Sequence, residues 1–190
     1  MPQGARVYHS PVRKVLDWVV TVVVAIGFVL VFEAEVAKPF KVPTSSMEPT
    51  LHCAKPGLWC EASFNDRVIA NRLAYRFSSP KRGQIVVFTA PQGACGTGGT
   101  FIKRLIGLPG DRIVERDGYL WIDGRRLREP YVSPALRGDQ SGSWTVPRGH
   151  YFFMGDDRIH SCDSRMWGTV PRSSLIGPVL LTYWPPNRWF

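Results

Sequence analysis

The chain has 190 residues and a formal net charge of +9, a length that suits one domain with at most a short appendage. Hydrophobic residues make up 44% and charged residues 21% of the sequence, which excludes a disordered or collagen-like protein. The mean hydropathy of −0.10 excludes a multi-span membrane protein. The 18 glycines and 16 prolines are too many for a helical bundle and favour short strands joined by turns.

The excess of positive charge does not by itself indicate a nucleic-acid-binding protein. Such a protein gathers its basic residues into one stripe or patch. Here they are scattered singly or in pairs, and the densest cluster is Arg125, Arg126 and Arg128. We therefore expect a solvated basic surface, for which anionic lipid headgroups are as reasonable a partner as nucleic acid, and we expect no nucleic acid in the function.

An apolar run stands near the start of the chain. Residues 15–32 read VLDWVVTVVVAIGFVLVF, with Asp17 as the one charge, and as a helix they would span roughly 27 Å, close to the hydrocarbon core of a bilayer. Arg13 and Lys14 precede the run, which favours a cytoplasmic N-terminus. A cleaved signal peptide fits less well, because Glu35 would occupy the −3 position for cleavage after Ala37.

These features predict three segments. Residues 1–14 are a short cytoplasmic N-terminus, residues 15–37 a transmembrane signal-anchor helix, and residues 38–190 an extracytoplasmic domain. We expect Trp59 and Trp189 of that domain to lie at the lipid interface, where tryptophan is favoured.

Short β-type runs dominate after residue 40, so the domain is predicted to be mostly β. Asp-Gly dipeptides at 117–118 and 123–124 are strong hairpin signals, because both turn positions need a positive φ. Residues 66–77 fit either a helix or a strand, turn and strand. The predicted strands are residues 84–88, 100–106, 112–115, 119–122, 125–127, 151–154 and 179–184.

Four cysteines suit an oxidising compartment, and their spacing is not that of a metal site. Cys53 and Cys60 bracket a short loop, so a local disulfide between them is plausible, and Cys95 could then pair with Cys162. Four cysteines allow three connectivities, however, and the sequence does not choose among them.

Two segments carry candidate catalytic groups. Residues 40–51, FKVPTSSMEPTL, place Ser45 and Ser46 between prolines just beyond the predicted membrane exit. Residues 101–111, FIKRLIGLPGD, place Lys103 in an apolar strand. A lysine amine that faces an apolar wall has a lowered pKa, and the neutral amine is a usable general base for a serine hydroxyl.

A third segment, residues 154–165, reads MGDDRIHSCDSR and concentrates acids, hydroxyls and arginines. Its simplest interpretation is a polar loop with salt bridges. His160 raises the alternative of a Ser-His-Asp triad, but the chain has no G-x-S-x-G nucleophile motif, which makes that alternative weak.

Together, in this order behind an anchor, the three segments resemble the bacterial type I signal peptidases, serine proteases of the Ser-Lys class. Residues 43–51 match the family's P-x-x-S-M-x-P-T-L run, residues 103–111 its K-R-x-x-G-x-P-G-D run, and residues 155–165 its G-D-[ND]-x-x-x-S-x-D-S-R block. Residues 82–88 match R-G-D-x-V-x-F except at one acid. The resemblance covers roughly residues 15–184.

The departures from the family pattern are few. Gln84 replaces the acid of the R-G-D-x-V-x-F block, and Ile159-His160 stand where bacterial members commonly have Asp-Asn. None of these touches the expected Ser-Lys pair, so they bear only on the details of the loop.

The resemblance assigns roles to particular residues. It implies Ser46 as nucleophile and Lys103 as general base, with the backbone N–H of Ser46 and the hydroxyl of Thr44 as oxyanion hole. Ser161 matches the hydroxyl that orients the lysine amine. Four charged residues match those that brace the site through ion pairs: Arg104, Asp156, Asp163 and Arg165.

The implied fold is a signal-peptidase-type β-barrel or sheet domain with a smaller, hairpin-rich cap over residues 112–153. The implied activity is cleavage of signal peptides from secreted preproteins after small residues at −1 and −3, without metal or cofactor. The substrate would add as a strand along residues 40–44 and 100–103. The expected partners are preprotein signal peptides, the lipid bilayer and, transiently, the translocation machinery, with the chain single-pass in a bacterial plasma membrane.

Other functions remain open at this stage. Self-cleaving repressors use the same Ser-Lys β-fold, but they carry a DNA-binding helix-turn-helix where this chain has an apolar run. A specialised pilus or conjugation peptidase with one substrate is a second possibility, and a non-catalytic, membrane-anchored β-domain is a third.

Overall fold

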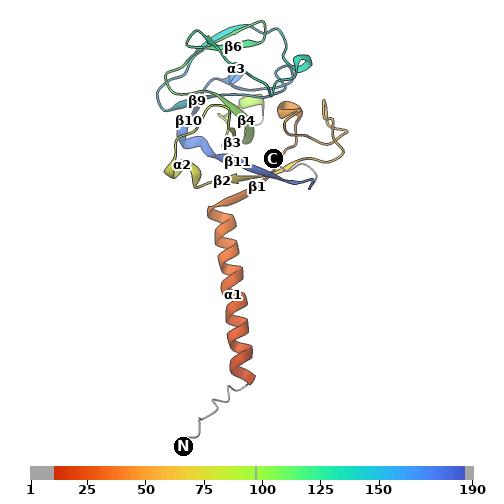
Figure 1. Cartoon of the computed structure of the whole chain (residues 1–190), viewed down its shortest axis with the longest axis vertical. Coiled ribbons are helices and arrows are strands. Elements are labelled where there is room, and N and C mark those ends of the chain that lie inside the picture. The colour runs from red at the N-terminus through yellow and green to blue at the C-terminus, as the bar shows by residue number, and fades with distance from the viewer. Residues whose placement is uncertain (1–10, 97, 187–190) are drawn as a thin grey trace, which may run out of the picture.

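The computed structural model describes residues 11–96 and 98–186 and consists of a long helix joined to a β-rich domain (Figure 1). The helix α1, Pro11–Glu35, covers most of the segment predicted as a transmembrane helix over residues 15–37 but ends two residues earlier. The backbone N–H of Val36 donates to the Phe32 carbonyl at 2.8 Å, and strand β1 begins at Ala37. Among the described residues, no helix combines the length and the apolar character needed to cross a membrane.

The domain contains eleven strands among the described residues, and the short helical turns lie between them. The strands are β1 Ala37–Lys41, β2 Arg67–Asn71, β3 Ile85–Thr89, β4 Thr100–Gly107, β5 Arg112–Arg116, β6 Tyr119–Ile122, β7 Arg125–Arg126, β8 Gly142–Thr145, β9 His150–Met154, β10 Val170–Pro171 and β11 Leu175–Trp184. The short helices are η1 Ser45–Met47, α2 Ala74–Phe77, η2 Ala94–Gly96, η3 Pro134–Leu136, α3 Ser164–Trp167 and η4 Arg172–Ser174. The mostly β fold predicted from the sequence is confirmed.

Seven strands form a curled, half-barrel sheet in the order β1-β2-β11-β3-β4-β9-β10 (Figure 1). All the pairings are antiparallel. Strand β11, the last of the described strands, lies between β2 and β3 and so joins the early pair β1-β2 to the rest of the sheet. Residues 66–77, for which the sequence left two interpretations, form β2 followed by a turn and the short helix α2.

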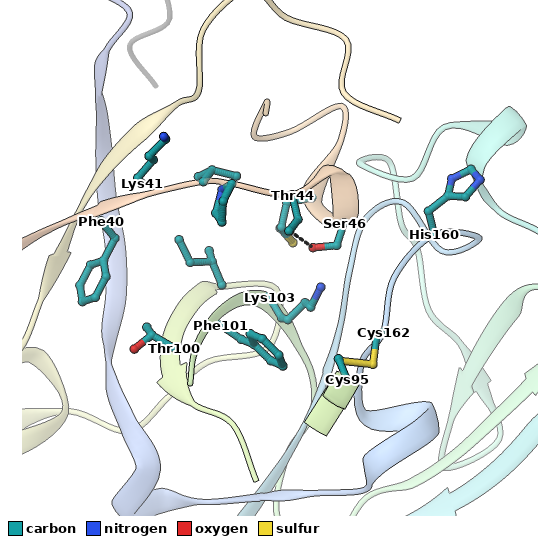
Figure 2. Close-up of a pocket in the computed structure, with 14 residues that line it drawn as sticks. Phe40, Lys41, Thr44, Ser46, Cys95, Thr100, Phe101, Lys103, His160 and Cys162 are labelled. Atoms are coloured by element: carbon teal, nitrogen blue, oxygen red, sulfur yellow. Dashed lines mark hydrogen bonds between the residues drawn. A yellow bond between two sulfur atoms is a disulfide. The ribbon is translucent and has the colours of Figure 1, made fainter. Parts of the chain in front are cut away.

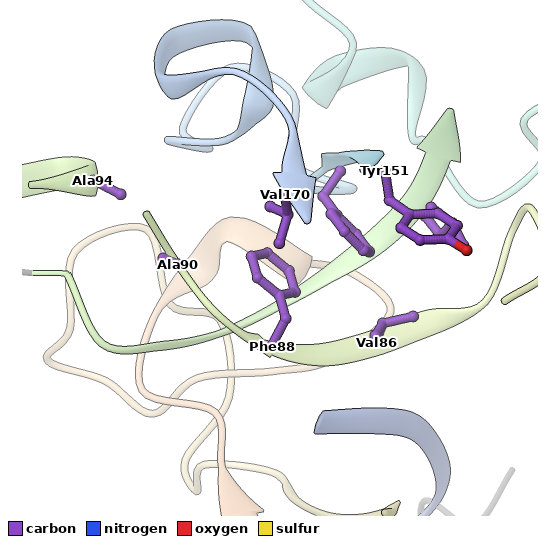
Figure 3. Close-up of a cluster of buried hydrophobic side chains, with 8 residues drawn as sticks. Val86, Phe88, Ala90, Ala94, Tyr151 and Val170 are labelled. Atoms are coloured by element: carbon purple, nitrogen blue, oxygen red, sulfur yellow. The ribbon is translucent and has the colours of Figure 1, made fainter. Parts of the chain in front are cut away.

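The main core lies over the middle of this sheet. Phe88 of β3 and Phe153 of β9 are fully buried and stack with their ring centroids 4.3 Å apart. Val86, Tyr151 and Val170 pack around them (Figure 3). Apolar burial of this kind contributes most of the favourable free energy of folding. The strands β3, β4 and β9 are therefore a rigid support for the side chains and loops attached to them.

A second sheet, in the order β7-β6-β5-β8, forms the cap. Its two Asp-Gly turns have positive φ at both central residues: 48° and 72° at 117–118, and 50° and 81° at 123–124, as expected of type I′ hairpins. The cap strands occupy residues 112–145, whereas the expected cap range of 112–153 also includes β9. That strand pairs with β4 in the large sheet instead.

Both disulfides left open by the sequence form in the structure: Cys53–Cys60 and Cys95–Cys162. The first closes a loop between η1 and β2. The second joins the segment before β4 to the loop that contains Ser161, two segments 67 residues apart in the chain.

A buried ion pair joins the cap to the rest of the domain. The Arg158 guanidinium, which is buried, contacts the carboxylate of Glu129 and also donates to the Gly155 carbonyl at 2.9 Å. Arg137 approaches the same carboxylate at 3.4 Å. Removal of one partner from such a pair leaves a charge that is neither hydrated nor neutralised.

We expect Glu129→Ala to lower the free energy of unfolding by about 3–5 kcal/mol, because the Arg158 charge stays buried without its partner. Urea unfolding followed by circular dichroism measures this. The exposed Asp139→Ala serves as control and should cost less than about 0.5 kcal/mol. A Glu129→Ala cost as small as that of the control would contradict a structural role for the pair.

Candidate functional site

A pocket of about 480 Å³ lies between the chain that follows β1 and the beginning of β4 (Figure 2). Ser46 and Lys103 both line it, as do Thr44 and His160. The two segments in which the sequence analysis placed the expected nucleophile and base therefore meet in one cavity, although they are far apart in the chain.

Ser46 is placed by a short 3₁₀ turn. Proline residues flank the turn. Met47 and Leu51 hold it in place, because both are buried in one apolar cluster with Val42 and Val68. The Thr44 hydroxyl lies 3.4 Å from the Ser46 hydroxyl. The expected oxyanion donor and the expected nucleophile are therefore neighbours at the pocket wall.

Lys103 is buried in β4, where it pairs with Val86 of β3. Only 4% of it is exposed. Burial lowers the pKa of its amine to about 8, since desolvation outweighs the opposing attraction of the nearby Asp163 carboxylate. The sequence left open whether Lys103 points outward or inward; it is buried, and near pH 8 a substantial fraction of its amine is neutral.

Ser161 lies behind the pocket rather than in its wall. Its hydroxyl is buried and has no hydrogen-bond partner among the described protein atoms. Gly155 separates it from the serine turn so closely that a Cβ at this position would overlap both the Ser46 carbonyl oxygen and the Ser161 hydroxyl. The Asp157 N–H donates to the same Ser46 carbonyl at 3.2 Å, so residues 155–161 pack directly against the turn that carries Ser46.

The four charged residues expected to brace the site form two ion pairs. Arg104 Nη2 lies 2.6 Å from Asp156 Oδ2, and Arg165 Nε lies 2.9 Å from Asp163 Oδ1. The Arg104 guanidinium also stacks over the Tyr131 ring, 3.8 Å from its centroid. Two of the three carboxylates that act on Lys103, those of Asp156 and Asp163, are therefore each partly neutralised by an arginine.

His160 contacts a carboxylate of the same loop, as the polar-loop interpretation expected, and also makes a ring stack that the sequence did not indicate. Its Nδ1 lies 2.9 Å from the Asp157 carboxylate, and its ring stacks on Trp59 with centroids 4.1 Å apart. No hydrogen bond joins it to Ser46 in the described part of the chain, so a Ser-His arrangement is not formed.

Trp59, which the sequence analysis expected at the lipid interface, stacks on pocket-lining His160 and remains 58% exposed. Trp189 lies outside the described residues. Trp59 and His160 lie far apart in the sequence, so only the folded structure shows that their rings stack.

One cluster in the described part of the chain has side chains that could hold a metal ion: Glu48, His52 and Glu61. His52 Nδ1 contacts the Glu48 carboxylate directly. A histidine–carboxylate ion pair accounts for this contact without a metal. The cluster lies outside the pocket lining and supplies nothing to the Ser46–Lys103 geometry.

Comparison with known proteins shows which protein family the chain resembles. The sequence matches the family described as "Signal peptidase, peptidase S26" over residues 15–184. It is 37% identical over 170 residues to probable signal peptidase I-2 of Synechocystis, covering 88% of this chain and 72% of that protein. It is 33% identical over 222 residues to signal peptidase I of Mycobacterium tuberculosis, covering 91% and 74%. A crystal structure of a signal peptidase I from Enterococcus faecalis aligns with a TM-score of 0.47 at 37% identity, covering 54% of this chain and 97% of that one.

These matches define the protein as a hydrolase of the serine endopeptidase class. More particularly, the chain belongs to the signal peptidase family, peptidase S26. The family resemblance read from the three sequence blocks is confirmed.

We expect Gly155→Ala to impair both folding and peptidase activity, because the added methyl must displace either the Ser46 carbonyl or the Ser161 side chain. The expected changes are a loss of about 1–3 kcal/mol in stability and at least about a tenfold fall in kcat/KM. Gly27→Ala is the control, since nothing lies within 4 Å of its added Cβ. Equal kcat/KM in Gly155→Ala and wild type would contradict the close packing.

Lys103 should destabilise the folded protein at neutral pH, because its amine has a pKa of about 8 when folded and 10.5 when exposed. Between these values the unfolded chain binds more protons, so this residue's contribution to stability rises with pH. We expect Lys103→Met to raise the free energy of unfolding by about 3 kcal/mol below pH 8.

That gain should shrink from pH 8 to 10.5. Urea unfolding at pH 7 and pH 10 measures it, with the exposed Lys81→Met as control. A gain of the same size at both pH values would mean that the substitution acts through packing and not through the charge.

Proposed function

We propose that the chain is a membrane-anchored serine endopeptidase that removes signal peptides from secreted preproteins, with Ser46 as nucleophile and Lys103 as general base. One observation carries this proposal. The Ser46 hydroxyl and a buried lysine amine with a pKa of about 8 line the same cavity. A hydroxyl and a neutral amine in one water-poor pocket are the two groups that acyl transfer needs.

The proposed reaction follows from their placement. Ser46 Oγ attacks the scissile carbonyl and passes its proton to Lys103 Nζ. The oxyanion accepts hydrogen bonds from the Ser46 N–H and the Thr44 hydroxyl. Lys103 returns the proton to the departing amine. It then removes a proton from the water that attacks the ester and returns that proton to Ser46 Oγ as the acid leaves. The Ser161 hydroxyl, which has no hydrogen-bond partner among the described protein atoms, is the group that would orient the amine during this cycle.

The substrate would lie as an extended strand between residues 40–44 and 100–103, which form opposite sides of the pocket. Such a strand places alternate side chains toward the wall. Phe40, Phe101 and Ile102 line the cavity and give it an apolar surface for the substrate side chains. We propose that these side chains are small at −1 and −3, the Ala-x-Ala pattern that the family resemblance implies.

We propose that α1 anchors the enzyme in a bacterial plasma membrane, with residues 1–14 cytoplasmic and the domain from residue 38 outside. Val15, Trp18 and Val20 point to different sides of a helix that turns about 100° per residue, yet all are more than half exposed. Figure 1 shows α1 projecting away from the domain. Exposed apolar side chains on several sides of a helix can contact lipid, and anchoring would concentrate the enzyme beside membrane-held signal peptides.

The full-length chain in detergent should cleave a preprotein after the −1 alanine of an Ala-x-Ala site. Ser46→Ala and Lys103→Ala should each lower kcat/KM by about 10³-fold or more. Wild-type kcat/KM should rise about tenfold per pH unit up to pH 8 and then level off, because the base must be deprotonated.

Circular dichroism checks that the variants are folded, and Lys81→Ala, on the surface, should cleave like wild type. Full activity of Lys103→Ala would exclude the Ser-Lys pair. No cleavage by folded wild type would favour an enzyme dedicated to one pilus or conjugation substrate, or a non-catalytic domain, over a general signal peptidase.

A further inference from the structure

The pocket that contains Ser46 extends to a side that the proposed reaction leaves unused. Its lining reaches from Phe40 and Thr100 to His160, and Figure 2 shows His160 on the opposite side of Ser46 from the other two. The proposed function places the substrate residues before the scissile bond on the side of Phe40 and Thr100. The residues after the scissile bond therefore leave the cavity on the side of His160.

The His160 ring is held in place by two different contacts. Its Nδ1 lies 2.9 Å from the carboxylate of Asp157, which is buried, and the His160 N–H donates to the same carboxylate at 3.1 Å. The ring also stacks on Trp59, with the two ring planes 17° apart. The two rings are thus positioned before any substrate arrives, which lowers the entropic cost of a contact with them.

Trp59 belongs to a compact loop that the Cys53–Cys60 disulfide closes. The loop is tight enough that a Cβ at Gly57 would overlap the Cys60 sulfur. Trp59 itself has a φ of 63°, a left-handed conformation that is unfavourable for a bulky residue. More than half of its surface is exposed, so little burial offsets this strain. A strained and exposed tryptophan beside a pocket points to a contact outside the domain.

The surface around the two rings is apolar. Leu58 and Ile159, the chain neighbours of Trp59 and His160, are 79% and 44% exposed. The Asp157 carboxylate that contacts His160 is itself buried, so the rings and not this charge face the solvent. Apolar side chains exposed at the edge of a cavity favour an apolar ligand, and aromatic rings pack well against aliphatic or aromatic groups.

We propose that Trp59 and His160 bind an apolar side chain of the substrate within the first two residues after the scissile bond. The start of the mature protein then influences how fast its signal peptide is removed. This inference rests on the Ser46–Lys103 reaction of the proposed function. Since successive side chains of an extended chain point in opposite directions, only one of the two residues faces the rings. The stack on a pocket-lining ring favours substrate over lipid as the partner of Trp59.

The test uses the full-length chain in detergent and three preproteins that share one Ala-x-Ala site. They carry Gly-Gly, Phe-Gly or Gly-Phe at +1 and +2, and kcat/KM is measured for each. Wild type should cleave one of the two phenylalanine substrates about threefold to tenfold better than the Gly-Gly substrate. Trp59→Gly removes the ring and suits the φ of 63°; it should lower this ratio to about one. Trp59→Phe should keep most of the ratio.

Phe64→Ala is the matched control. Phe64 is also 58% exposed and lies in the same segment between η1 and β2, but it packs edge-on against Trp184. The control should keep the wild-type ratio. A ratio is the appropriate readout, because a loss of activity common to all three substrates cancels in it, and circular dichroism checks that each variant is folded.

Two outcomes would overturn the proposal. An unchanged ratio in Trp59→Gly would favour lipid as the partner of Trp59, and an equal gain from phenylalanine at +1 and at +2 would show a general affinity for apolar peptides. Cleavage of the Gly-Gly substrate by wild type and not by Ser46→Ala tests the proposed function separately. Absence of that cleavage contradicts both, whereas cleavage without a phenylalanine preference contradicts this inference alone.

Discussion

The burial of the Lys103 amine, which lowers its pKa, is the constraint on which the rest of the pocket depends. Lys103 lies in the middle of a sheet whose core is fully apolar, and desolvation is the largest influence on its pKa. A cation in such a place costs folding free energy, so the surrounding β3, β4 and β9 must be well packed to tolerate it. Stacked phenylalanines and continuous antiparallel pairing provide that packing. The burial that lowers the pKa of Lys103 thus depends on the same apolar packing that holds the domain together.

The charged loop that follows β9 limits how far its own carboxylates raise the pKa of Lys103. Free carboxylates beside Lys103 would attract the proton and raise its pKa, but Asp156 and Asp163 are each joined to an arginine. The same loop touches the serine turn, through the hydrogen bond from Asp157 and the close approach of Gly155. The Cys95–Cys162 disulfide ties it to the segment that leads into β4. Electrostatic balance and the position of Ser46 therefore depend on one loop, which explains why so many acids and arginines are gathered in twelve residues.

Strand β1 connects α1 to the Ser46–Lys103 pocket. It begins at Ala37, directly after α1, and the chain that follows it forms part of the pocket wall. Pairing of β1 with β2, which in turn pairs with the C-terminal strand β11, gives this connection its rigidity.

The sequence by itself determined the β class, the Asp-Gly hairpins of the cap, and the segments that contain Ser46, Lys103 and Ser161, because turn chemistry and strand alternation are local properties. Only the tertiary structure decided the disulfide pairing, the assignment of β9 to the large sheet, the stacking of Trp59 on His160 and the burial of Lys103. Each of these depends on the distance between residues remote in the chain, which no local pattern encodes. The pKa of Lys103 belongs to this second group, since it is set by burial beneath segments far from it in sequence.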